Sequence, residues 1–225
     1  MHPQLQCFLH GTALTRGFGL HTAAGRIHLL FNKERIMDFN TLQAACLSCQ
    51  KCGLCQTRTH VVFGMGSPHA EVMFIGEGPG RNEDEQGLPF VGRSGQLLDK
   101  YLAAIHLKRE DIFITNIVKC RPPENRDPTP QEWEACMPYL REQFRLIRPK
   151  IIVCLGRIAA QRLIRPDFSV MKEHGQWTEK GGTLFTATPH PAALLRNPSQ
   201  KPAAFGDFVA LREKIQEICT HTYRA

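Results

Sequence analysis

The sequence alternates between short apolar runs and longer segments with helical periodicity, and this alternation limits the possible folds more than any other feature. The apolar runs cover residues 71–76 (EVMFIG), 111–118 (DIFITNIV), 150–156 (KIIVCLG) and 182–189 (GTLFTATP). Short runs rich in Ile, Val, Phe and Thr indicate strands that are buried on both faces. Because helical patterns separate them, the sequence predicts βαβ units and an α/β fold around a mostly parallel sheet.

The helical patterns carry signals for their own ends. Residues 94–105 have apolar side chains on one face and begin at Ser94, a candidate N-cap. Residues 129–147 begin with the sequence TPQE, a capping box with proline in the first turn, and Pro138 within them predicts a bend. Further helical patterns cover residues 156–164 and 205–218.

Composition restricts the partners and the setting of the protein. The 225 residues carry a formal charge of +7 at pH 7, a modest bias toward polyanions such as nucleic acids. The sequence has no apolar run of about 18 residues and no signal-peptide pattern. We therefore expect a cytoplasmic protein with no membrane partner.

The first 36 residues differ from the rest of the chain. They have no clean periodicity and no acidic residue before Glu34. We expect residues 1–36 to be an extension that is disordered or results from a mis-assigned start, and residues 37–225 to form the domain. A transit peptide is the alternative, because such segments bear arginine and few acids, although this segment is not rich in serine.

The nine cysteines include four that recur at every third position. These four are Cys46, Cys49, Cys52 and Cys55. In a reducing compartment, such a cluster indicates a metal site and not a disulfide framework, because thiolates are soft metal ligands. The residues alone are compatible with zinc and with an iron–sulfur cluster.

Chemically active residues follow the first apolar run in the sequence GEGPGRNEDEQGLPFVG, residues 76–92. Ligands of open parallel sheets bind beyond the carboxyl ends of the strands, which is where this loop lies. Its glycines are spaced unlike a dinucleotide loop, and Pro79 removes an amide, so we exclude a nicotinamide or flavin cofactor. The loop supplies acids and Phe90. A solvated acidic run with Phe90 in the core explains this segment equally well.

Two other loops follow strand ends. Asn116 ends the second run and is followed by the basic, proline-rich sequence KCRPPENRDP, which suits phosphate contacts. Alone, Asn116 would be read as a turn former. The fourth run leads to His190, which is held between two prolines and followed by Arg196 and Lys201. Together the three loops bring acids, an aromatic ring, an amide, an imidazole and cations to one edge of the sheet.

These motifs occur in a recognisable order. The sequences GEGPGRNEDEQGLPFVG, TNIVKCRPPENRDPTPQE, LGRIAAQRL and HPAALLRNP, preceded by Cys-x-x-Cys and RTHVVFGMG, resemble those of the family-4 uracil-DNA glycosylases, from about Cys49 to the final helix. The resemblance implies a three-layer α/β/α fold with a four-stranded, mostly parallel sheet and a [4Fe–4S] cluster. It also implies a DNA repair enzyme that flips uracil out of DNA and hydrolyses its N-glycosidic bond, leaving an abasic site.

The resemblance further implies which cysteines hold the cluster. The family's second cysteine lies six positions before the arginine of the RT pair, which is Arg58, and this distance selects Cys52. The implied ligands are Cys49, Cys52, Cys120 and Cys136, with zinc as the alternative metal. Cys46 and Cys55 are then bystanders, and no metal role is expected for Cys7, Cys154 and Cys219.

The resemblance also assigns roles around the base. Phe90 is expected to stack on uracil, and Asn116 to donate to O4 and accept from N3–H. His190 is expected to donate to O2, assisted by backbone amides near Gly78. Some other uracil glycosylases carry an aspartate where this chain has Gly78, so Glu77 and then Glu83 are the candidates for orienting water.

The expected nucleic-acid partner is uracil-containing DNA, single- or double-stranded, bound by a monomer associated with the nucleoid. Arg121 and Arg196 are expected to hold phosphate, and Leu195 to wedge the duplex. Leu195 could equally be a simple anchor of its loop. The alternatives are a non-catalytic nucleic-acid-binding module on a four-cysteine metal site and a protein that captures uracil-DNA covalently. Capture would need a histidine in a basic insertion, which KCRPPENRDP lacks.

Overall fold

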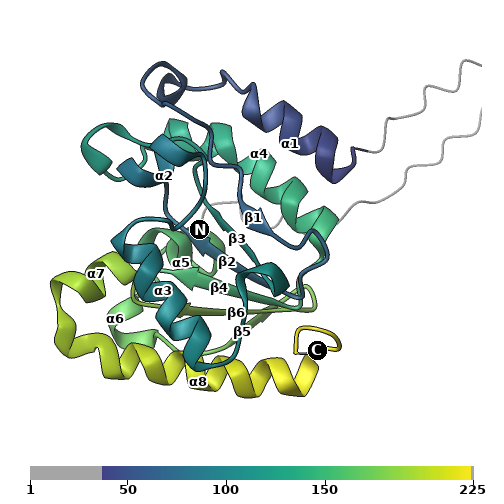
Figure 1. The fold of residues 1–225 in the computed structure, drawn as a ribbon, viewed down its shortest axis with the longest axis vertical. Helices are drawn as coiled ribbons and strands as arrows, with labels where there is room; N and C mark the ends of the chain where they lie inside the picture. The colour runs from purple at the N-terminus through teal and green to yellow at the C-terminus, as the bar shows by residue number, and fades with distance from the viewer. Residues whose placement is uncertain (1–36, 224–225) are drawn as a thin grey trace, which may run out of the picture. The chain divides into compact units, whose positions relative to one another are not determined.

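The apolar runs form the centre of a single sheet in the computed structural model of the protein, which describes residues 37–223 (Figure 1). The predicted extension, residues 1–36, lies outside the described residues. The strands are β1 (Met65–Gly66), β2 (Val72–Gly76), β3 (Phe113–Asn116), β4 (Ile151–Leu155), β5 (Thr178–Lys180) and β6 (Thr183–Thr188). The helices are α1 (Phe39–Leu47), α2 (Arg81–Gln86), α3 (Arg93–Ala104), α4 (Pro130–Ile147), α5 (Arg157–Leu163), α6 (Val170–Glu173), α7 (Pro191–Arg196) and α8 (Lys201–Ile218). Short 3₁₀ turns cover Gly53–Gln56, Arg109–Asp111, Pro123–Asn125 and Pro198–Gln200.

The sheet has six strands in the order β1-β3-β2-β4-β6-β5. The four central strands, β3, β2, β4 and β6, are parallel and correspond to the four predicted runs. The expected count of four was therefore too low, because β1 and β5 pair antiparallel at the two edges. Both edge strands are very short and incompletely buried, so they lack the apolar signature that marks a central strand.

Helices cover both faces of the sheet, which confirms the predicted three layers. Along β2, Val72 and Phe74 belong to one apolar cluster, and Met73 and Ile75 belong to the other. The first cluster includes apolar residues of α3 and α8, and the second includes residues of α1, α4 and α5. Figure 1 shows α1 and α4 on one side of the sheet and α3 and α8 on the other. None of the helices in the described part of the chain combines the length and apolar character needed to cross a bilayer.

The helix starts agree with the sequence in one case and differ in another. The predicted capping box opens α4: the Thr129 side chain accepts from the Glu132 amide at 3.4 Å, and the Glu132 carboxylate accepts from the Thr129 amide at 2.8 Å. Pro138 lies inside this helix, which is assigned continuously from Pro130 to Ile147. Ser94 was wrong as the N-cap of α3, because the extended residue before the helix is Gly92 and Ser94 is already helical.

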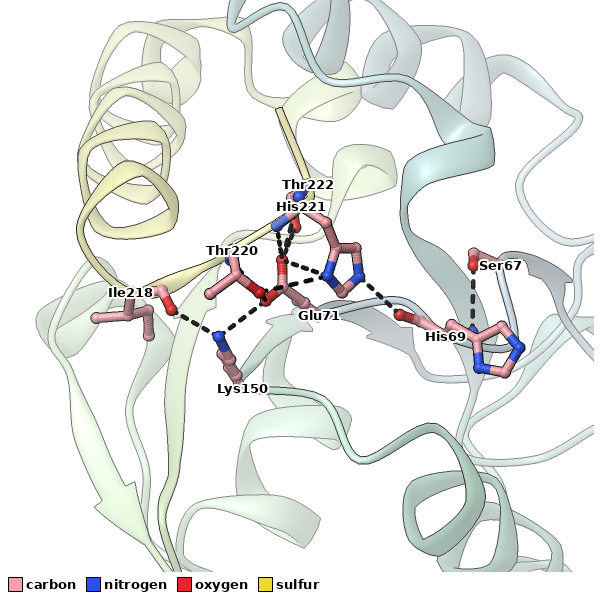
Figure 2. Close-up of polar contacts among 8 residues, drawn as sticks. All are labelled: Ser67, His69, Glu71, Lys150, Ile218, Thr220, His221 and Thr222. Atoms are coloured by element: carbon pink, nitrogen blue, oxygen red, sulfur yellow. Dashed lines mark hydrogen bonds and ion pairs between the residues drawn. The ribbon is translucent and has the colours of Figure 1, made fainter. Parts of the chain in front are cut away.

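Residues 220–222 are tied to Glu71, which directly precedes β2 (Figure 2). The Glu71 side chain is only 5% exposed and accepts from the amides of Thr220, His221 and Thr222 at 2.7, 2.9 and 3.1 Å. Hydroxyl groups of the two threonines donate to the same carboxylate at 2.9 and 2.8 Å. Lys150 Nζ lies 2.9 Å from it and also donates to the carbonyl of Ile218. Residues 220–222, which follow α8, therefore pack as part of the folded domain.

Candidate functional site

The loops after β2, β3 and β6 line one cavity of about 560 Å³ at the carboxyl edge of the sheet. Seven of the predicted site residues lie in its wall: Glu77, Gly78, Glu83, Phe90, Asn116, His190 and Arg196. The parallel strands bring these residues together because their carboxyl ends meet at one edge.

Asn116 is the last residue of β3 and is 1% exposed. Its Oδ1 atom has no hydrogen-bond partner among the described residues. An unpaired buried acceptor costs about 1 to 3 kcal/mol, so this atom is suited to a donor supplied by a ligand. Gly76 permits the arrangement: a Cβ atom there would lie 2.4 Å from Asn116 Oδ1 and 2.6 Å from Phe90 Cζ.

Phe90 lies beside Asn116 in a strained backbone conformation. Its φ is +53°, in the left-handed region that non-glycine residues rarely adopt. Two side chains hold it there. Arg109 donates to the carbonyls of Pro89 and Phe90 at 3.1 and 2.5 Å, and Glu83 Oε1 accepts from the amides of Val91 and Gly92 at 2.9 and 2.8 Å. The ring is therefore presented to the cavity by a fixed loop.

His190 is held in a defined tautomer. It is the N-cap residue of α7, and its Nδ1 atom accepts from the amide of Ala192 at 3.1 Å. The ring proton must then be on Nε2. Burial, together with the charge of Arg196, lowers the pKa of His190 to about 4, so the imidazole is neutral at pH 7. Its ring lies 5.8 Å from that of Phe90 between centroids.

The two candidate acids have different surroundings. Glu83 is engaged with the two amides that follow Phe90. Burial and the neighbouring Asp127 raise the pKa of Glu77 to about 7, while Arg157 opposes that shift. Gly78 itself lies close to Val118, since a Cβ atom at this glycine would be 2.8 Å from Val118 Cγ2. A larger residue such as aspartate would require this neighbour to move.

Asp127 and Arg157 are cavity residues that the sequence interpretation missed. They form an ion pair at 2.5 Å. Arg157 comes after Gly156 at the carboxyl end of β4, so the rule that ligands bind beyond carboxyl strand ends also indicates this residue. Asp127 lies in the basic sequence KCRPPENRDP, whose cations indicate phosphate contacts but do not point to this acid.

The predicted DNA contacts lie in different places. Arg196 is exposed and lines the cavity. Leu195 is half-buried against the apolar cluster beneath α7, and Arg121 Nε donates to Asn125 Oδ1 at 2.8 Å. Neither belongs to the described cavity lining, whereas the exposed Met171 does.

The cysteines predicted as ligands meet in a second cavity. Its wall contains Cys49 and Cys52 from the N-terminal segment and Cys120 and Cys136 from distant parts of the chain. Cys46 and Cys55 line it as well, so the cavity brings together six thiols. Cys154 is buried in β4, Cys219 follows α8, and Cys7 lies outside the described residues.

The donor groups around this cavity suit anionic sulfur. Arg58 Nη1 donates to Cys120 Sγ at 3.3 Å, and the amide of Lys119 donates to Cys136 Sγ at the same distance. Hydrogen bonds to thiolate sulfur are a usual feature of iron–sulfur sites. Within residues 37–223, no three His, Cys, Asp or Glu side chains converge on a single ion. Ligands of a multi-iron cluster each bind a different iron atom, so they need not converge in that way.

Comparison with known proteins agrees with this geometry. Residues 63–211 match the family model described as the uracil DNA glycosylase superfamily. A type-4 uracil-DNA glycosylase of Archaeoglobus fulgidus is 46% identical over 183 residues, which cover 77% of this chain and 89% of the relative. One from Thermotoga maritima is 40% identical, with 76% and 90% covered. A type-5 uracil-DNA glycosylase of Pyrobaculum aerophilum is 32% identical, with 57% and 64% covered. The chain belongs to the uracil DNA glycosylase superfamily and, within it, to the type-4 uracil-DNA glycosylases.

Proposed function

We propose that this protein removes uracil from DNA by hydrolysing the N-glycosidic bond, releasing free uracil and leaving an abasic site for base excision repair. One observation carries the proposal: an unpaired, buried amide oxygen at Asn116 shares a cavity with a neutral imidazole and a fixed aromatic ring. The partner is uracil-containing DNA, and the catalytic domain spans residues 37–225.

Recognition of the base rests on Asn116 and Phe90. The amide oxygen accepts from uracil N3–H, and the amide nitrogen donates to O4. Cytosine presents the reverse pattern at these two positions, and it would leave buried polar groups unpaired. The Phe90 ring stacks on the base after it has left the DNA stack, which costs a few kcal/mol of lost stacking and pairing.

Departure of the base relies on His190. As the glycosidic bond breaks, the sugar becomes cationic and the base takes negative charge. The neutral imidazole donates its Nε2–H to uracil O2, and backbone amides near Gly78 assist, as donors do in an oxyanion hole. The bond from the Ala192 amide to Nδ1 supports this role, because it keeps the donor proton on Nε2.

Water is oriented by Glu77 in this scheme. Its carboxyl lines the cavity with a pKa of about 7, so an appreciable fraction is ionised at neutral pH. Glu83, the second candidate, is better suited to holding the loop of Phe90, because one of its oxygens already accepts from two amides. On the DNA side, we assign phosphate contacts to Arg196 and Arg121 and the wedge to Leu195, in a protein that acts as a monomer.

For the cysteine cavity we propose a [4Fe–4S] cluster on Cys49, Cys52, Cys120 and Cys136. When bound, such a cluster would cross-link the N-terminal segment to the loop after β3 and to α4. Zinc would use the same four thiolates. Membership in the type-4 family, together with the N–H donors that face Cys120 and Cys136, favours the cluster.

Two other functions are disfavoured by particular residues. A non-catalytic binding module would give no reason for Asn116 and His190 to share a cavity. Covalent capture would need a histidine after Lys119, where the sequence reads KCRPPENRDP.

The test is a glycosylase assay with the purified full-length chain and no added metal or nucleotide. Oligonucleotides that contain uracil, single-stranded or opposite guanine or adenine, should yield free uracil and strand breaks on alkaline treatment. Hypoxanthine and thymine substrates measure the range of bases accepted. Absence of uracil release from every substrate would refute the proposal.

A further inference from the structure

Residues 58–60, which we call the strap, connect the cysteine cavity to α2. Arg58 lines the cavity and donates to Cys120 Sγ at 3.3 Å. The next amide, that of Thr59, donates to both carboxylate oxygens of Asp84, each at 3.0 Å. His60 Nδ1 lies 2.9 Å from the carbonyl oxygen of Asp84, and a carbonyl only accepts, so this nitrogen is the donor. Two consecutive strap residues therefore hold a single residue of α2.

Asp84 is buried although it is an acid on a surface helix. It is 3% exposed, whereas the adjacent Glu85 is exposed and pairs with Arg81. Among the ion pairs of the described residues, none includes Asp84. Burying an unpaired carboxylate is costly, and here both oxygens are directed at one backbone amide of the strap. The side chain therefore contributes a fixed attachment.

The same short helix holds the loop of Phe90. Glu83, adjacent to Asp84, accepts from the amides of Val91 and Gly92 at 2.9 and 2.8 Å. Glu83 and Asp84 are consecutive residues of α2, which has only six residues, Arg81–Gln86, so a shift of this backbone moves both carboxylates. The strained conformation of Phe90 needs continuous support from its surroundings. A shift of α2 would therefore act on both of its attachments, the one to the strap and the one to the loop of Phe90.

We propose that Asp84 is a positioning residue that couples the cysteine cavity, through the strap and α2, to the loop that presents Phe90. The proposal extends the proposed function and rests on it in two assumptions, that Phe90 stacks on uracil and that the cysteines bind a metal. Loss of metal at the cysteines would then loosen the base-binding loop without any direct contact between the two sites.

Amide hydrogen exchange tests the coupling independently of activity. In the full chain, Asp84→Ala should accelerate exchange of the Val91 and Gly92 amides about tenfold or more, while iron and sulfide per chain stay unchanged. Asp84→Asn keeps one acceptor oxygen and should give a smaller increase. The matched control is Glu85→Ala on the same helix, which should change neither quantity. Unchanged exchange at Val91 and Gly92 in a folded Asp84 variant would overturn the proposal.

A double-variant comparison separates coupling from general loosening. Cys52→Ser should also accelerate exchange at Val91 and Gly92, but in the Asp84→Ala background it should add little, because the connection is already broken. Fully additive effects would overturn the proposal. On uracil-containing oligonucleotides, kcat/KM should fall about tenfold in Asp84→Ala and be restored in part by Asp84→Asn. If the wild-type chain releases no uracil, the proposed function fails while the exchange measurements still decide the coupling.

Discussion

At the residue scale, the cavity contains polar groups that differ in what already engages them. Asn116 Oδ1 has no partner within the described residues, and His190 Nδ1 is committed to an amide. Glu83 is committed to two amides, and Glu77 lies beside Asp127 and Arg157. Glu83 holds backbone amides, whereas the partners of Glu77 are side chains that line the same cavity, and this difference separates the two acids.

The first prediction concerns the pH dependence of Glu77. Only the ionised carboxylate can act as a base toward water, and burial raises its pKa to about 7. The value of kcat/KM for uracil release should therefore fall as pH drops below about 7, approaching tenfold per pH unit. Removing the adjacent charge with Asp127→Asn lowers the pKa of Glu77, so the falling limb should move to lower pH.

The control for this prediction is Asp167→Asn, which changes an exposed acid that pairs with Arg165. It should leave the profile unchanged. A flat profile between about pH 5.5 and 8, or one that Asp127→Asn does not shift, would remove Glu77 from the water-activating role.

The second prediction concerns Asn116. Asn116→Asp removes the donor to uracil O4 and adds negative charge next to a departing base that is itself becoming negative. We expect kcat/KM for uracil to fall about 10²- to 10³-fold. Steady-state release of uracil measures this, with cytosine-containing oligonucleotides assayed in parallel. Asn40→Asp, the same change at an exposed residue outside the described cavity lining, is the matched control. Equal losses in both variants would argue against a specific role for Asn116.

At the scale of elements, the segment after α8 is held to the start of β2 by Glu71 (Figure 2). Five donor groups of residues 220–222 and Lys150 converge on one carboxylate. Because these partners stabilise the charged form, the pKa of Glu71 is lowered well below its ordinary value. Residues 220–222 are thus held in place after α8 ends at Ile218, although they carry no helical or strand pattern in the sequence.

The third prediction is that Glu71→Gln lowers the free energy of unfolding at pH 7 by about 2 to 4 kcal/mol, since buried donors and Lys150 lose their charged partner. Urea denaturation measures it. The folded-state pKa is lowered, so the contribution of Glu71 is complete above its unfolded pKa of 4.5 and is lost as pH falls below that value. The difference between wild type and variant should therefore shrink in acid.

Glu110→Gln provides the control for this prediction, because Glu110 forms an exposed pair with Lys108. We expect a change within about 0.5 kcal/mol. Similar losses in the two variants would contradict a special role for the Glu71 site.

At the scale of the whole molecule, the cysteine cavity joins parts of the chain that lie far apart in sequence. Cys49 and Cys52 follow α1, Cys120 follows β3, and Cys136 lies in α4. A metal bound by all four would stabilise the domain by the amount that its binding favours the folded state.

The fourth prediction is that Cys52→Ser abolishes the iron content and the brown colour of the purified protein and lowers its Tm. Cys55→Ser and Cys46→Ser should retain the iron and the colour, although these two thiols line the same cavity. Iron and sulfide analysis and visible absorbance measure the outcome. Loss of colour in Cys55→Ser with retention in Cys52→Ser would shift the ligand assignment by one repeat. If the wild-type protein is colourless and contains zinc and no iron, the site binds zinc and the assignment of a cluster is wrong.

Much of the fold followed from local patterns. The central strands, the capping box of α4 and the carboxyl edge as the position of the cavity were all predicted, because periodicity, caps and parallel pairing depend on neighbouring residues. The edge strands β1 and β5 were not predicted, since they pair through backbone groups and carry no buried run. Ser94 was wrong as a cap because the N-cap is Gly92 and Ser94 already lies in the first turn of the helix.

The sequence by itself determined the class of fold, the edge at which the site forms and the residue types available there. The order and spacing of its motifs also indicated the family. Only the tertiary structure decided that Glu83 holds two backbone amides, that Asp127 and Arg157 lie next to Glu77, and that six thiols share one cavity. The physical reason is that desolvation and hydrogen-bond partners come from residues distant in the chain, as with Asp127 and Arg157, and no local pattern records such contacts.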